Sequence, residues 1–126
     1  MRAVDTNVLV RLVVRDDERQ VNTAEAFIGG GAWVSHIALV EVAWVLESVY
    51  GRAPDAIAIA VEMLLHHEHL TLQDADAVTN ALVHFRRQPK LGFSDCLMVE
   101  VARKAGHGPL GTFDKLLGRV DGATSL

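Results

Sequence analysis

The chain has 126 residues, a formal net charge of −4 and a pI near 5.8; half of its residues are hydrophobic and 22% are charged. This composition excludes an intrinsically disordered chain, and the length predicts a single domain over residues 1–126 with one core. The acidic balance provides no long-range attraction for nucleic acid, which argues against a passive nucleic-acid binder, although local arginines and lysines can still contact phosphates.

The sequence contains no segment that predicts a membrane span, because charged residues interrupt every apolar stretch before the ~20 residues that a spanning helix needs. Asp5 and Asn7 fall where a secretory signal would require an unbroken apolar region. Cys96 is the only cysteine, which excludes an intrachain disulfide and a multi-cysteine zinc site. We therefore expect a cytoplasmic protein.

Short apolar segments that predict strands alternate along the chain with longer segments of helical spacing. Glycines or a proline end several of the helical segments, and Ser35 is a candidate N-cap. In chain order the expected elements are a strand at 2–5, a nearly all-apolar segment at 8–14, a helix at 18–28, a strand at 32–35, helices at 37–50 and 54–67, a strand at 70–72, helices at 75–87 and 94–105, and a strand at 110–112.

This order of elements predicts an α/β fold. Parallel strands need crossover connections, which are normally helical, so we expect a three-layer α/β/α sandwich with a short central parallel sheet. In open sheets of this kind, ligands bind beyond the carboxyl ends of the strands. Residues that carry chemistry are therefore expected just after each strand.

Acidic residues occupy several of these positions. Asp5 and Asp114 each follow a predicted strand, and Asp95 lies in the first turn of a predicted helix. Each has a structural alternative, since Asp is a preferred N-cap and a negative charge is favoured near a helix N-terminus.

Glu41 is the only charged residue among the apolar residues of the segment 37–46. A helix that is apolar all round is expected to be buried, and a carboxylate there must be paired, protonated or bound to a cation. A salt bridge to an arginine is the alternative interpretation of Glu41.

Four carboxylates gathered at one edge of a sheet would repel one another unless a pKa rises or a divalent cation offsets the charge. An all-oxygen site suits Mg²⁺ or Mn²⁺, and such an ion activates water and stabilises charge at a phosphodiester. Asp5, Glu41, Asp95 and Asp114 are therefore the candidate metal ligands and catalytic residues.

Four segments resemble, in order, the four acidic motifs of PIN domains: residues 4–9 (VDTNVL), 39–46 (LVEVAWVL), 92–97 (GFSDCL) and 112–115 (TFDK). The chain is most similar to the VapC-type toxins of toxin–antitoxin pairs. The resemblance implies an α/β/α fold, Mg²⁺- or Mn²⁺-dependent RNA endonuclease activity, a homodimer, and inhibition by an antitoxin. It also implies that the four acids surround the metal and that Asn7 and Thr112 support them.

Other interpretations stay open. A PIN-like domain could serve only to bind a partner protein, and the same metal chemistry could act on DNA. A receiver-type phosphoacceptor domain is disfavoured, because Asp5 stands alone where paired acids are expected.

Three further groups of residues have ordinary structural explanations. The spacing of His66, His67 and His69 matches no common zinc pattern. Cys96 is expected to be a buried thiol and not a nucleophile. The basic residues Arg86, Arg87 and Lys90 are expected to be solvated surface unless RNA phosphates cross them.

Overall fold

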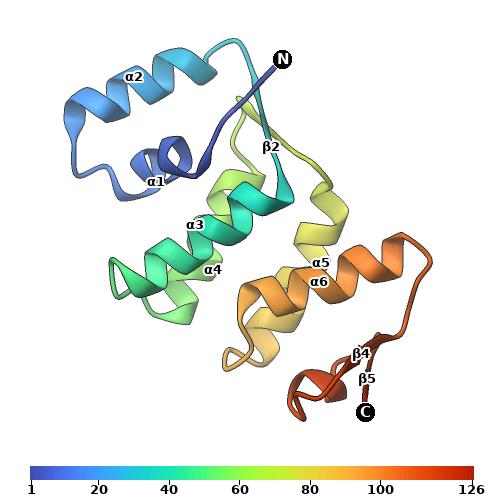
Figure 1. Cartoon of the computed structure of the whole chain (residues 1–126). Helices are drawn as coiled ribbons and strands as arrows, with labels where there is room; N and C mark the ends of the chain where they lie inside the picture. The colour runs from blue at the N-terminus through green and yellow to red at the C-terminus, as the bar shows by residue number, and fades with distance from the viewer. The chain divides into compact units, whose positions relative to one another are not determined.

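The computed structural model describes all 126 residues, which divide into two compact units, Met1–Ala75 and Asp76–Leu126 (Figure 1). Six helices and parallel strand pairs confirm the α/β fold class and are compatible with a three-layer α/β/α arrangement. The first unit contains β1 (Arg2–Ala3), α1 (Thr6–Val14), α2 (Glu18–Ile28), β2 (Ala32–Val34), α3 (His36–Ser48), α4 (Pro54–Leu65) and β3 (Leu70–Leu72). The second contains α5 (Ala75–Arg87), α6 (Phe93–Lys104), β4 (Leu110–Thr112), the 3-10 helix η1 (Leu117–Arg119) and β5 (Ala123–Ser125). The first residue of α5, Ala75, is the last residue of the first unit.

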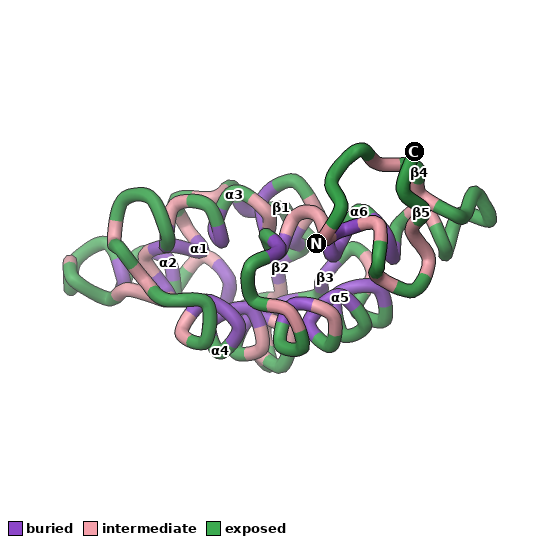
Figure 2. Tube along the Cα trace, turned by 90° about the horizontal axis from the view of Figure 1, so that it is seen from below, coloured by how far each residue is buried: buried purple, intermediate pink, exposed green.

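The three strands of the first unit form a parallel sheet in the order β1-β2-β3. In β2 and in β3 the first and third residues are buried and the middle residue is exposed. Because successive side chains of a strand point to opposite faces, one face of this sheet carries the apolar core of the unit. The helices likewise carry buried and exposed residues in alternation along their length (Figure 2).

Side-chain caps fix where three helices of the first unit begin. Asp5, Asp17 and Ser35 each accept a hydrogen bond from the backbone amide three residues later, at 3.2, 3.1 and 3.1 Å. Each cap is worth about 1 kcal/mol because it satisfies an amide that has no partner within the helix. α4 instead begins at Pro54, whose missing amide needs no partner.

The expectation that the helix around Glu41 is buried all round is wrong. Glu41 is exposed, and so are Ile37 (73%) and Trp44 (65%), which lie four residues before it and three residues after it on α3. These three residues form one outward strip, because residues three and four apart share a helix face. The helix was predicted to be buried all round because Ile37 and Trp44 are apolar, but both are exposed. The buried face of α3 consists of Ala38, Leu39, Val42, Ala43 and Leu46.

In the second unit β4 pairs in parallel with β5, and η1 lies between them in the chain (Figure 1). A glycine is required in this connection: Gly122 has φ +99°, and a Cβ there would collide with the guanidinium of Arg103. Phe85 and Phe93 join α5 to α6 with an edge-on ring contact at 6.1 Å between centroids. No helix in either unit has the length and apolar character needed to cross a membrane.

Candidate functional site

A pocket of about 440 Å³ lies at the carboxyl ends of β1 and β2 in the first unit. This is the edge of the sheet at which a ligand is expected. Three of the predicted site residues, Asp5, Asn7 and Glu41, line it. The complete lining is Val4, Asp5, Thr6, Asn7, Ser35, Ile37, Ala38, Glu41 and Val45.

Asp5 acts as a helix cap and also lines the pocket. Its Oδ1 accepts the amide hydrogen bond of Val8 at 3.2 Å, which starts α1 where β1 ends. The capping explanation of Asp5 is therefore correct, and it does not compete with a ligand role, because a carboxylate has a second oxygen.

Glu41 lines the same pocket from α3. Thr6, a residue that the sequence analysis did not single out, holds Glu41 from α1. The hydroxyl of Thr6 donates to Oε2 of Glu41 at 3.1 Å and so joins α1 to α3 directly. No arginine pairs with Glu41, so the salt-bridge alternative is wrong. The signal for Thr6 was its position next to Asp5 at a strand end.

Asp95 and Asp114 form a second pair of acids in the second unit. Burial raises the pKa of the Asp95 carboxyl, and the negative charge of Asp114 raises it further. Asp95 lies in the first turn of α6, whose N-cap is Gly92 with no side-chain hydrogen bond, so Asp95 is not the cap of this helix.

Asp114 is fixed by the turn that follows β4. Its Oδ1 accepts hydrogen bonds from the amides of Leu116 and Leu117, both at 2.9 Å, and its own amide donates to Oγ1 of Thr112 at 3.0 Å. Thr112 therefore holds the peptide of Asp114 in place, and its supporting role at a metal site stays a prediction.

The four predicted acids thus fall into two pairs, Asp5 with Glu41 and Asp95 with Asp114, one pair in each unit. Neither unit by itself gathers three His, Cys, Asp or Glu side chains that could hold a metal ion, and the convergence of all four acids stays a prediction. The chemistry of each pair fits a hard divalent cation, because carboxylate oxygens are the ligands that Mg²⁺ prefers. Burial is the main cause of the raised pKa of Asp95, and the repulsion from Asp114 that adds to it is the kind that such a cation offsets.

Neither the cysteine nor the histidine cluster adds chemistry to these pairs. Cys96 is buried, which confirms the prediction of a buried thiol, and burial together with the charge of Asp95 raises its thiol pKa to about 12, which disfavours a thiolate nucleophile. In the histidine cluster, the amide of His69 donates to Nδ1 of His67 at 3.1 Å, so that nitrogen is already used within its own turn.

A hydrogen-bonded group around the buried residue Glu100 in the second unit was also missed. Glu100 is 4% exposed; its Oε2 lies 2.8 Å from Nε2 of His84 and accepts a hydrogen bond from Nε of Arg103 at 3.2 Å. The sequence did contain a signal, because Glu100 follows the buried residues Phe93 and Cys96 at helical spacing.

The fold and the two acid pairs define an α/β protein in which Asp5 and Asp114 follow strands and Glu41 and Asp95 lie on helices. The PIN domain family matches residues 2–123, which is nearly the whole chain, and the protein therefore belongs to this family. PIN domains are generally nucleases that use divalent metal ions. No curated protein and no solved structure gives a significant match to the chain.

Proposed function

We propose that the chain is a metal-dependent endoribonuclease that hydrolyses RNA phosphodiester bonds with Mg²⁺ or Mn²⁺ held by Asp5, Glu41, Asp95 and Asp114. The single observation that carries this proposal is that its four acids form two pairs: Asp5 and Glu41 line one pocket at a strand edge, and the charge of Asp114 adds to burial in raising the pKa of Asp95. Membership of a family of nucleases supports the same conclusion.

Each residue has a definite part in this proposal. Asp5 and Glu41, which line one pocket, would be ligands of the ion, while Thr6 orients Glu41 by its hydrogen bond. Thr112 fixes the peptide that carries Asp114, and Asn7 lines the same pocket as Asp5. A bound divalent ion supplies an activated water and stabilises the charge that develops on the phosphate.

Removal of the metal tests the mechanism. Cleavage of a fluorescent single-stranded RNA should require added Mg²⁺ or Mn²⁺ and should stop in EDTA, because in the proposed mechanism the bound ion activates the attacking water. The measurement is the rate of product formation on a denaturing gel, with the metal restored after EDTA as the control. Cleavage that continues undiminished in EDTA contradicts the metal mechanism.

Thr6 is expected to act as a positioning residue. Thr6→Val removes the hydroxyl that holds Glu41 and should lower kcat by about 10- to 100-fold, the usual effect of losing a partner of a metal ligand. Thr6→Ser keeps the hydroxyl and should restore most of the activity. If the Val and Ser variants lose activity equally, the hydrogen bond to Glu41 is not what positions the acid.

The biological role that we propose is the toxin of a type II toxin–antitoxin pair, active as a homodimer and inhibited by an antitoxin encoded beside it. The resemblance of the four acidic segments to VapC-type toxins supports this role. A small neighbouring reading frame whose product binds this chain and suppresses RNA cleavage is the expected finding. Neighbouring genes that encode no such inhibitor contradict the role and leave the nuclease proposal standing.

One observation favours a second function, that of a protein-interaction module. Ile37 and Trp44 are apolar and exposed on both sides of Glu41, which is the kind of surface that a partner protein covers. An interaction module would show no metal-dependent cleavage. Calorimetric titration with Mn²⁺, with and without Asp95→Asn, separates the two, since only the nuclease should bind the ion through Asp95.

A further inference from the structure

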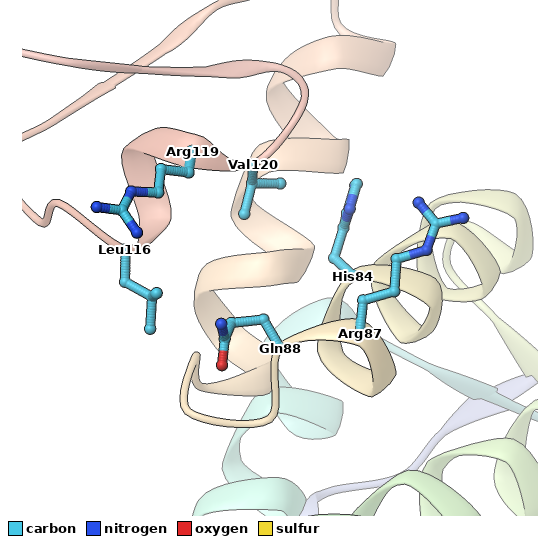
Figure 3. Close-up of a pocket in the computed structure, with 6 residues that line it drawn as sticks. All are labelled: His84, Arg87, Gln88, Leu116, Arg119 and Val120. Atoms are coloured by element: carbon cyan, nitrogen blue, oxygen red, sulfur yellow. The ribbon is translucent and has the colours of Figure 1, made fainter.

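A second pocket, of about 280 Å³, lies within the second unit between the end of α5 and η1; we call it the α5–η1 pocket. Figure 3 shows side chains from α5 on one side and side chains from the η1 segment on the other. Its lining consists of His84, Arg87, Gln88, Leu116, Arg119 and Val120. None of these residues belongs to the two acid pairs.

The lining is positively charged although the whole chain is acidic. Arg87 and Arg119 form no ion pair with any carboxylate, and no Asp or Glu lines the pocket. Glu100, which contacts the lining residue His84, is buried and already bonded to His84 and Arg103. Two unpaired guanidinium groups beside a hollow provide a site for an anion, and phosphate is the anion whose geometry arginine matches best.

A favourable interaction with a helix dipole does not explain why both Arg87 and Arg119 line the α5–η1 pocket. Basic residues in the last turn of α5 offset the partial negative charge of that helix end, which would explain Arg87 alone. Arg119 comes from η1, a different element, and lines the same pocket. In Figure 3 the guanidinium groups of Arg87 and Arg119 lie on opposite flanks and point apart. Because the two guanidinium groups do not converge on one point, they suit an extended strand that carries several phosphates better than one free phosphate ion.

The α5–η1 pocket is tied structurally to one of the predicted metal ligands. Leu116, which lines the pocket, donates its amide to Oδ1 of Asp114 at 2.9 Å. The amide of Gly118 also donates to the backbone oxygen of Asp114 at 2.9 Å, so η1 and Asp114 share one hydrogen-bonded turn. A strand held in the pocket would therefore run beside this carboxylate.

We propose that the α5–η1 pocket binds the sugar-phosphate backbone of single-stranded RNA next to the bond that is cleaved, through Arg87 and Arg119. This inference rests on the proposed function, which supplies RNA as the substrate. Contacts of this kind fix the position of the strand and do not read its sequence.

The test measures binding without cleavage. Fluorescence anisotropy of a labelled single-stranded RNA is recorded in EDTA at several salt concentrations for the whole protein and for Arg87→Ala and Arg119→Ala. Each substitution should weaken binding by about tenfold and lower the slope of log affinity against log salt by about 1, because each removes one phosphate contact. Both side chains lack an ion-pair partner, so the variants should fold, which circular dichroism checks.

Arg19→Ala is the matched control, since it removes an exposed arginine on α2 of the first unit and should leave RNA binding unchanged. Inorganic phosphate at millimolar concentration should not displace the RNA; displacement by micromolar phosphate would show a free-phosphate site and overturn the proposal. Wild-type affinity in both arginine variants, or a loss as large in Arg19→Ala, also overturns it. If the wild type binds RNA through these arginines and cleaves none with Mg²⁺ or Mn²⁺, the nuclease proposal fails and the pocket assignment stands.

Discussion

Asp5→Asn should lower the rate of RNA cleavage by about 10³-fold, equivalent to about 4 kcal/mol of transition-state stabilisation, while the protein stays folded. The activity falls because an amide oxygen is a neutral and weaker ligand for a hard cation than a carboxylate. The fold survives because Asn caps a helix as well as Asp does, so the hydrogen bond from the amide of Val8 is kept. The measurements are kcat with saturating Mn²⁺ and the thermal unfolding midpoint.

Asp17→Asn is the control that separates the two roles of Asp5. Asp17 caps α2 with the same geometry, accepting the amide of Gln20 at 3.1 Å, and it does not line the pocket of Asp5 and Glu41. The same chemical change at this cap should therefore leave cleavage intact. Full activity in Asp5→Asn would show that Asp5 is only a cap, and the proposed metal site would have to be abandoned.

Much of the fold could be predicted from local sequence signals. The bounds of β3, α5, β4 and α2 were predicted correctly because apolar spacing indicates them, together with a nearby glycine or proline for α5, β4 and α2. The prediction missed η1 and β5, the two short elements that follow Asp114. They have no apolar periodicity, and their positions depend on pairing with β4 and on the tight connection at Gly122.

The candidate site could be predicted in part. Asp5 and Glu41 were assigned from a strand end and from an isolated charge, and they do line one pocket. The argument for Glu41 was nevertheless wrong, since it is exposed, and hydropathy alone cannot tell an exposed apolar strip from a buried one. Thr6 and Arg119 were missed because their significance comes from contacts between elements distant in the chain, which no local pattern encodes.

Asp95→Asn should also abolish cleavage. It should in addition change how the stability of the protein depends on pH, in a direction set by the raised pKa of Asp95. Burial and the charge of Asp114 raise the pKa of Asp95 in the folded protein. The unfolded chain therefore loses this proton at lower pH than the folded protein does. Without metal, stability falls as pH rises from the unfolded pKa through the folded pKa, and the destabilisation persists at neutral pH.

Because Asn carries no charge, Asp95→Asn should be more stable than the wild type in EDTA at pH 7, and this advantage should vanish in acid. Saturating Mn²⁺ should reverse the order: ion at about 100 times its Kd stabilises the wild type by about 2.7 kcal/mol, and the variant by less. Thermal unfolding in EDTA and in Mn²⁺ measures both effects. Asp55→Asn, an exposed acid on α4, should show neither. If Asp95→Asn is less stable than the wild type in EDTA and gains as much from Mn²⁺, then Asp95 serves the packing of α6, and the metal must be held by other residues.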